Sequence, residues 1–232
     1  MNIFIDSDDG GGPGATFSNV TLLLGFEDGN GATSFTDDSN SAFTVTGQGG
    51  GQVTTSQSKF GGGSLQVHGT SGAARAEIAQ AANAGFDFGG GPFCIECWVR
   101  YISGQGQSQW HILDANQTGT ARFLLRYEGT TNLNFYVNGT ILMTPTYTLP
   151  DGVWEHIAVT RDGDDWRMFA AGVLLTTVNS ATTMASGTTA LYIGNSDNGD
   201  VFGGEIDEVR FVKGEPVYTS TFTPPTTAFP RS

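Results

Sequence analysis

Apolar and polar residues alternate along much of the chain, and this period of two is the pattern of half-buried β-strands. The pattern is clearest at 93–101, where every second residue from Phe93 onward is apolar and is predicted to face a core. Glu96, Trp98 and Arg100 lie between them and should share the opposite face. Further strands are predicted at 19–26, 42–46, 64–68, 75–79, 109–114, 121–127, 132–137, 154–161, 165–170, 173–178, 189–194 and 203–213.

Turn-forming residues separate these runs. The 232 residues include 34 glycines, and Gly, Asn, Asp or Pro lies in most of the gaps. Helical periodicity is almost absent, apart from one short turn predicted at 79–84. Short strands that recur this often indicate an all-β sandwich or barrel.

The chain divides into three predicted parts. Residues 1–18 form a flexible N-terminal arm, 19–214 form the β-domain, and 215–232 form an extended, proline-rich tail. Prolines cannot occupy a central strand, so the tail should wrap over the surface with its phenylalanines docked. No apolar run has the length of a secretory signal or a membrane span, and a soluble chain is expected.

Charge narrows the classes of partner. The net charge is −13, from 23 acidic and 10 basic residues, which disfavours nucleic acid and anionic membranes as partners. Cys94 and Cys97 would point to opposite faces of one strand, so no disulfide is expected between them.

Several motifs, in order, resemble laminin-G-like, concanavalin A-like domains. They are LLLGFED at 22–28, FGGGSLQV at 60–67, FCIECWV at 93–99, DGVWEHIAVTR at 151–161, and LYIGN at 191–195 followed by FGGEIDEVR at 202–210. The resemblance covers roughly 20–213 and implies an all-β, two-sheet antiparallel jelly-roll sandwich.

The ending is similar to a narrower group. The run RFVKGEPVY at 210–218, followed by FTPP at 222–225 and Phe229-Pro230, resembles endings of such domains in head-decoration and tail-fibre proteins of tailed bacteriophages. This implies a homo-oligomeric protein on the virion surface, made in the host cytoplasm. Its partners would be capsid or tail proteins and a host surface glycan.

The resemblance also allows a test for glycoside hydrolase activity. Laminarinase-like relatives carry Glu-x-Asp-x-Glu on one strand, which places three carboxylates on one face. Here Glu205 and Asp207 match, Val209 replaces the third carboxylate, and Glu208 should point to the opposite face. His68, His111 and His156 are scattered among the strands and show no catalytic grouping. A non-enzymatic protein is therefore expected.

A structural Ca²⁺ is a further implication of the resemblance, because in the family such an ion often joins the first strand's loop to the last strand. The matching positions are Asp28 and Asp207, with backbone carbonyls near Gly63 and Ser64. Alternatively, the two aspartates only cap turns or pair with Arg210.

Carbohydrate binding would need exposed aromatic rings with polar neighbours. The candidates are Trp98, Trp110, Tyr127 and Tyr136, each of which could equally pack in the core. The expected function is a non-enzymatic virion protein of the capsid-decoration or fibre type that could bind glycans. The alternatives are a calcium-dependent lectin module and a divergent glycoside hydrolase.

Overall fold

The computed structural model describes residues 14–67, 73–79, 85–105, 109–116, 122–185, 190–196 and 199–232. In this part of the chain a short 3-10 helix, η1, precedes sixteen strands, and no helix is long and apolar enough to cross a membrane. The elements are η1 (Phe17–Asn19), β1 (Val20–Leu24), β2 (Ser34–Phe35), β3 (Val45–Gln48), β4 (Gln52–Thr54), β5 (Ser64–Gln66), β6 (Arg75–Ala79), β7 (Phe93–Tyr101), β8 (Gln109–Asn116), β9 (Phe123–Glu128), β10 (Asn132–Val137), β11 (Thr140–Met143), β12 (Trp154–Asp162), β13 (Asp165–Ala170), β14 (Val173–Asn179), β15 (Ala190–Ile193) and β16 (Gly204–Lys213).

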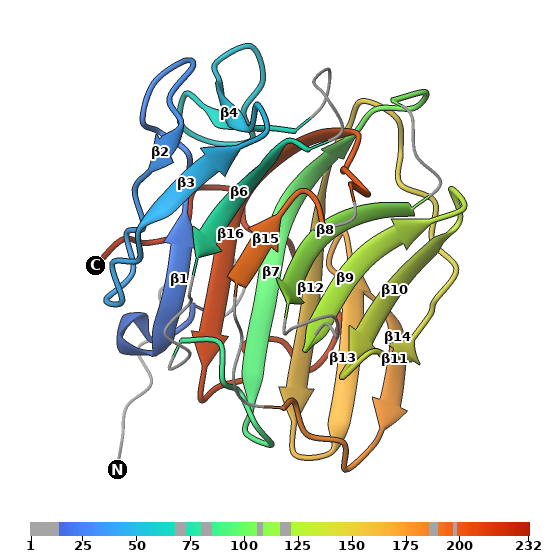
Figure 1. The fold of residues 1–232 in the computed structure, drawn as a ribbon. Helices are drawn as coiled ribbons and strands as arrows, with labels where there is room; N and C mark the ends of the chain where they lie inside the picture. The colour runs from blue at the N-terminus through green and yellow to red at the C-terminus, as the bar shows by residue number, and fades with distance from the viewer. Residues whose placement is uncertain are drawn as a thin grey trace.

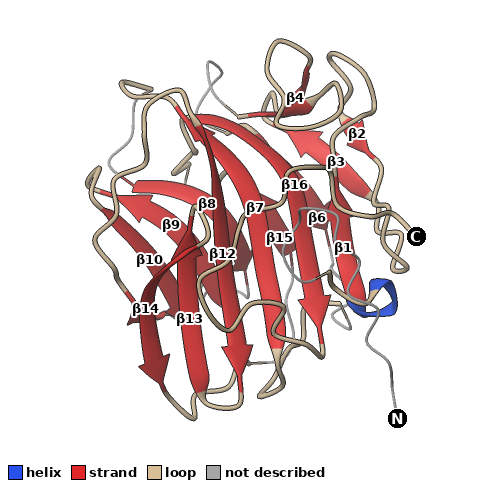
Figure 2. Ribbon diagram, turned by 180° about the vertical axis from the view of Figure 1, so that it is seen from behind, coloured by secondary structure: helices blue, strands red, loops and turns tan. Residues whose placement is uncertain are grey.

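The strands form two sheets that stack face to face (Figures 1 and 2). Sheet A has the order β14-β13-β12-β7-β16-β5-β4, and β1 also pairs with β16. Sheet B has the order β11-β10-β9-β8-β15-β6-β3-β2. Neighbouring strands in both sheets are antiparallel, so the prediction of an all-β, two-sheet antiparallel sandwich is confirmed.

The alternation along β7 sets the core. Phe93, Ile95, Cys97 and Val99 are buried between the sheets, as predicted. The intervening residues point to the outer face of sheet A, where Cys94 is also buried. Both cysteines are free thiols on opposite faces of the strand, in agreement with the sequence.

The C-terminal tail, residues 215–232, covers part of the outer face of sheet A. Tyr218 and Phe229 are buried there, and the ring of Phe222 stacks on that of Tyr218 with centroids 3.6 Å apart. The backbone N–H of Phe222 donates to the carbonyl oxygen of Gly172 at 2.9 Å, and the Thr160 hydroxyl donates to the carbonyl oxygen of Tyr218 at 2.9 Å. The predicted wrapping of the tail, with its phenylalanines docked, is confirmed.

Two other predictions fall largely outside the described residues. Of the flexible arm at 1–18, only 14–18 are described, and there the N–H of Thr16 donates to Glu215 at 2.6 Å. Of the helical turn at 79–84, only Ala79 is described, and it ends β6.

Candidate functional site

The outer face of sheet B carries a row of polar side chains built by strand register. His111 of β8 lies opposite Arg126 of β9, which lies opposite Asn134 of β10. In the next row, Asp114 of β8 lies opposite Tyr192 of β15. We call this surface the polar face, and it comprises Arg75, Glu77, His111, Asp114, Arg126, Glu128, Asn134, Tyr136 and Tyr192, with Asp200 from the loop before β16.

Three side chains of the polar face are almost fully buried, and each has at least one nitrogen or oxygen atom without a hydrogen bond. The exposed fractions are 6% for His111, 4% for Asp114 and 3% for Asn134. Neither ring nitrogen of His111, nor Oδ1 of Asp114, nor Oδ1 of Asn134 has a hydrogen-bond partner in the described part of the protein. A buried polar atom without a partner costs about 1–3 kcal/mol, so three such groups on one face, two on β8 and one on β10, indicate a place for a ligand or for bound water.

His111 lies between two carboxylates. Its Nδ1 is 3.4 Å from Oδ2 of Asp114, and its Nε2 is 3.7 Å from Oδ2 of Asp200. A register shift between His111 and Leu113 places one extra residue in β8, and this β-bulge allows both His111 and Asp114 to reach the polar face. The N–H of His111 also donates to the backbone oxygen of Asp200 at 3.0 Å, which fixes the loop beside the strand.

A second group lies across β9 and β10. Nη2 of Arg126 is 2.8 Å from Oε2 of Glu128, and the Arg126 guanidinium lies 4.6 Å from the centre of the Tyr136 ring while also bonding its hydroxyl. Asn134 donates through Nδ2 to Glu128 at 2.5 Å. Burial raises the pKa of Tyr136, so its hydroxyl stays neutral at physiological pH. These bonds hold the side chains in fixed positions on a rigid sheet.

The four aromatic residues predicted to bind sugar occupy different places. Trp110 and Tyr127 are buried between the sheets, where their rings stack with centroids 5.4 Å apart. Trp98 is buried on the outer face of sheet A under Lys59, whose Nζ lies 3.8 Å from the centre of its ring. None of these three presents an open ring to a sugar, because all three side chains are buried, with exposed fractions of 6% or less. Tyr136 is half-buried on the polar face.

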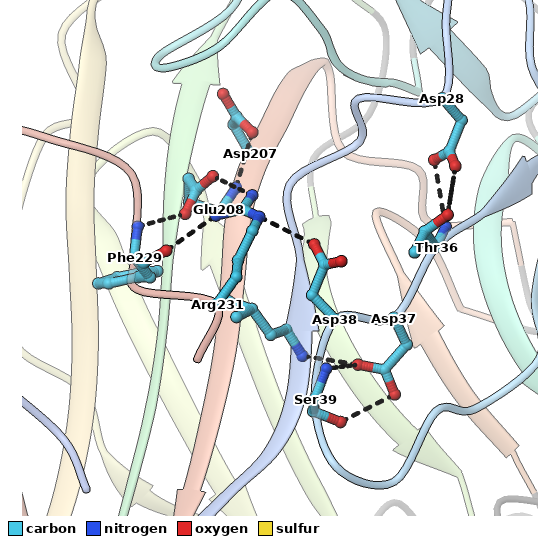
Figure 3. Close-up of polar contacts among 10 residues, drawn as sticks. Asp28, Thr36, Asp37, Asp38, Ser39, Asp207, Glu208, Phe229 and Arg231 are labelled. Atoms are coloured by element: carbon cyan, nitrogen blue, oxygen red, sulfur yellow. Dashed lines mark hydrogen bonds and ion pairs between the residues drawn. The ribbon is translucent and has the colours of Figure 1, made fainter. Parts of the chain in front are cut away.

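The predicted calcium ligands make other contacts. Asp28 accepts the backbone N–H of Thr36 at 3.1 Å and its hydroxyl at 2.6 Å. Asp207 accepts backbone N–H groups of Lys59 and Phe60 at 2.7 and 3.3 Å, and that of Glu208 at 2.8 Å. Figure 3 shows Asp28 directed at Thr36 and Asp207 beside Glu208.

Gly63 and Ser64 were predicted to contribute backbone carbonyl oxygens, which is a separate question from the contacts at their side-chain positions. A side chain at Gly63 would lie 2.3 Å from the carbonyl oxygen of Phe26, and the Ser64 hydroxyl donates to Gln57 at 2.8 Å. Burial raises the pKa of Asp207 to about 8, against the opposing effect of its N–H donors. Within the described ranges no group of three or more His, Cys, Asp or Glu residues could hold a metal ion. A site made of two aspartates and backbone carbonyls is not such a group, so calcium stays a prediction from the resemblance.

The prediction that Glu208 points to the opposite face from Asp207 was wrong. A β-bulge between Asp207 and Arg210 shifts the register of β16, and Glu208 adopts a φ of +47°. Its carboxylate accepts the N–H of Phe229 at 2.8 Å and Nη2 of Arg231 at 2.9 Å, both from the C-terminal tail (Figure 3).

The bulge also changes which residue follows Asp207 on the outer face. Asp207 lies opposite Trp98. The next residue of β16 that pairs with an outer-face residue of β7 is Arg210, opposite Glu96, whereas Val209 lies in the core. Glu205 is bound to Arg100, with Nη1 and Oε2 3.0 Å apart. A cation therefore stands where the third carboxylate of a laminarinase-like site would be expected.

Glu96 is the centre of a buried ion cluster beneath the tail. Its Oε1 accepts Nε and Nη2 of Arg210 at 2.8 and 2.6 Å, and its Oε2 binds Nε2 of His156 at 2.9 Å and the hydroxyl of Tyr218 at 3.0 Å. Burial raises the pKa of Glu96, but Arg210 and His156 outweigh it and lower the pKa to about 2. The cluster joins β7, β12 and β16 to the tail and is structural in character.

Of the three histidines that the sequence singled out, His156 bonds Glu96 through Nε2, while its Nδ1 has no hydrogen-bond partner among the described residues. In His111 both ring nitrogens are without such a partner, and His68 lies outside the described residues. Sequence reasoning missed His111, Asp114, Asn134 and Asp200 as a group. His111 and Asp114 are three residues apart, so a strict period of two would have placed them on opposite faces.

Solved structures share this fold. The binding domain of Paraclostridial Mosquitocidal Protein 1 matches with a TM-score of 0.64 and 12% identity, covering 86% of this chain and 50% of that chain. The binding domain of Botulinum Neurotoxin DC in complex with SialylT has the same TM-score and identity, covering 86% and 49%. Our chain thus spans about half the length of these two structures. At such identities the likeness shows the fold alone.

A third structure is matched over nearly its whole length. It is domain 4 of AbnA, a GH43 extracellular arabinanase from Geobacillus stearothermophilus, in complex with arabinotriose, with a TM-score of 0.62 and 17% identity over 84% of this chain and 93% of that chain. No curated protein matches the sequence. The model of the laminin G type of the concanavalin A-like lectin/glucanases superfamily matches residues 71–216, more than half of the chain. The chain belongs to the concanavalin A-like lectin/glucanases superfamily.

Proposed function

We propose that this protein is a non-enzymatic carbohydrate-binding module and that the polar face of sheet B is its binding surface. The observation that carries the proposal is the group of buried, unbonded polar atoms on His111, Asp114 and Asn134. Sugar hydroxyls both donate and accept hydrogen bonds, so one ring can satisfy groups of either kind.

The half-buried rings of Tyr136 and Tyr192 flank these atoms on neighbouring strands. Sites for sugars combine a few fixed polar groups with aromatic surface, and here both kinds stand on strands. Two of the solved structures of this fold were determined with SialylT and with arabinotriose, which supports a sugar as the class of ligand.

Binding without catalysis is supported by the outer face of β16. Glu205 is held by Arg100, Glu208 by Arg231, and the register position after Asp207 is taken by Arg210. An acid/base and nucleophile pair is two carboxyl groups about 5–10 Å apart across the sugar bond, whereas Glu205 and Glu208 are each bonded to an arginine. A reducing-sugar assay on β-glucans should give no product, and turnover would refute this part of the proposal.

The site itself is tested with His111→Leu. The ring nitrogens of His111 have no hydrogen bond to lose, although the ring separates the carboxylates of Asp114 and Asp200, so leucine should lower the melting temperature less than His156→Leu does. Binding to a glycan identified on an array should weaken at least tenfold, about 1.4 kcal/mol, because a ligand hydroxyl loses its partner.

His156→Leu is the matched control. It breaks the buried bond to Glu96 and should lower the melting temperature, while the affinity of the folded protein stays unchanged. If the unmodified protein binds nothing on a broad array, or if His111→Leu binds as well as the unmodified protein, the proposal fails.

We further propose that the module stands on the surface of a tailed-phage virion, attached to capsid or tail proteins and facing host glycans. The support is the resemblance of the ending at 210–230 to phage decoration and fibre proteins. Residues 215–232 dock on their own sandwich, which favours attachment to neighbours through another segment of the chain. The protein should co-purify with particles, and its presence in host cytosol but not in virions would reject this setting.

Calcium and self-association are separate expectations. If Ca²⁺ binds, its addition should raise the melting temperature and a chelator should reverse the rise, and Asp28→Asn should abolish the effect. A flat titration would remove the ion from the proposal. Light scattering on a sizing column gives the oligomeric state, for which the phage resemblance predicts more than one subunit.

A further inference from the structure

The charges of the polar face are unevenly paired. Its two guanidinium groups are each matched to a neighbouring glutamate: Nη2 of Arg75 lies 2.8 Å from Glu77, and Nη2 of Arg126 lies 2.8 Å from Glu128. The other two carboxylates, Asp114 and Asp200, have only His111 between them, at 3.4 and 3.7 Å. The centre of the face is therefore acidic.

Asp114 is the most confined of these carboxylates. It is 4% exposed, and its Oδ1 has no hydrogen-bond partner in the part of the protein that the structure describes. A carboxylate oxygen accepts hydrogen bonds and cannot donate them, so the group that completes this site must bring a donor. A sugar hydroxyl meets that requirement, whereas the carboxylate or sulfate of an acidic sugar does not.

The net charge of the whole protein also disfavours acidic ligands. The protein carries a net charge of −13, so an anionic glycan meets repulsion before it reaches the face. Both arginines could otherwise attract an anion, but each already shares its charge with an adjacent glutamate. No uncommitted cation stands beside Asp114 in the register rows of sheet B, where its direct neighbours are Leu124 and Tyr192.

We propose, building on the glycan-binding function above, that the polar face selects neutral glycans over acidic ones and that Asp114 sets this selectivity by accepting a hydrogen bond from a ligand hydroxyl. Asp200 adds a second negative charge on the other side of His111. His111 orders the centre of the site by standing between the two carboxylates. The class of ligand is an uncharged oligosaccharide with free hydroxyl groups.

The experiment uses a glycan array printed with pairs that differ only in charge: neutral oligosaccharides and the same oligosaccharides capped with sialic acid or sulfate. At low ionic strength, the unmodified protein should bind neutral members at least tenfold better than their capped partners. Asp114→Asn preserves the shape of the side chain and removes its charge, so this ratio should fall about tenfold, corresponding to about 1.4 kcal/mol.

Asp162→Asn is the matched control, because it removes one negative charge from an exposed position at the β12–β13 turn of sheet A. Its ratio should equal that of the unmodified protein. Asp200→Asn, in a half-exposed loop, should lower the ratio in the same direction and supplies the answer if Asp114→Asn does not fold.

Each result decides a different statement. Binding of capped members as strong as that of neutral ones overturns the neutral-glycan inference while the carbohydrate-binding function stands. Equal ratios for Asp114→Asn and Asp162→Asn refute the role of Asp114. Absence of binding to every printed glycan removes the proposed function and the inference with it.

Discussion

Replacing Glu96 with glutamine tests the buried cluster that holds the tail. The ordinary pKa of a glutamate is 4.5, and in the folded protein the pKa of Glu96 is lowered to about 2. Each pKa unit corresponds to about 1.4 kcal/mol, so the ionised side chain contributes about 3 kcal/mol to the free energy of unfolding at neutral pH. Removing one partner of a buried ion pair costs about 3–5 kcal/mol by independent measures, which agrees with this magnitude.

The pH dependence gives the prediction its sign. Because the folded pKa is below the unfolded one, the contribution of Glu96 is fully present above pH 4.5 and is lost as the pH falls toward 2. The difference in unfolding free energy between the unmodified protein and Glu96→Gln should therefore shrink by about 2 kcal/mol between pH 7 and pH 3. At pH 7 the melting temperature should fall by about 6–12 °C, as expected for a domain of this size.

Urea unfolding followed by tryptophan fluorescence measures both quantities. Glu215→Gln is the control. The Glu215 side chain bonds Thr16 near the surface, so this substitution should change the free energy of unfolding by no more than about 0.5 kcal/mol. A loss below about 1 kcal/mol for Glu96→Gln at pH 7, or a difference that is as large at pH 3 as at pH 7, would refute the reasoning.

Three further predictions concern the same region. Tyr218→Phe removes one donor to the buried carboxylate and should cost about 1–2 kcal/mol in urea unfolding, without changing glycan affinity. Gly172→Ala should expose the tail to limited proteolysis, because Gly172 has a φ of +75° and a Cβ there would lie 2.1 Å from the carbonyl oxygen of Phe222; equal cleavage rates would contradict this. Burial raises the pKa of the thiols of Cys94 and Cys97, so both should react with a thiol reagent only on unfolding, and fast labelling of the native protein would contradict their placement.

Regular strands made the fold readable from the sequence. The alternation of 93–101 placed Ile95 and Val99 in the core and Glu96 on the outer face, because an unbroken strand keeps its period of two. The prolines of the tail likewise indicated an extended segment outside the sheets. These features follow from local rules that the chain obeys over many residues.

The candidate site depended on two places where the period breaks. The bulge near Leu113 brings His111 and Asp114 to one face, and the bulge after Asp207 turns Glu208 toward the tail. A one-residue insertion in the register is not visible in the alternation of a short strand, so sequence reasoning assigned the wrong face to Glu208 and did not group His111 with Asp114. The aromatic candidates failed for another reason: apolar rings such as that of Trp110 fit a core as well as a sugar site, and only packing distinguishes the two.

The two outer faces of the sandwich differ because the C-terminal tail covers part of sheet A. On sheet A, the tail supplies Tyr218 to Glu96 and Arg231 to Glu208, so carboxylates that could have met a ligand are satisfied from within the protein. On sheet B, no corresponding segment among the described residues supplies a hydrogen bond to the ring nitrogens of His111 or to Oδ1 of Asp114. Sheet A also holds buried polar atoms without a partner, among them Nε1 of Trp98 and Nδ1 of His156, so the inference of a ligand depends on the gathering of His111 and Asp114 on one face and not on the unbonded state alone. His111→Leu on sheet B should therefore weaken glycan binding, and Glu96→Gln on sheet A should lower stability. The opposite pattern, with loss of stability from His111→Leu and loss of binding from Glu96→Gln, would contradict this division between the two faces.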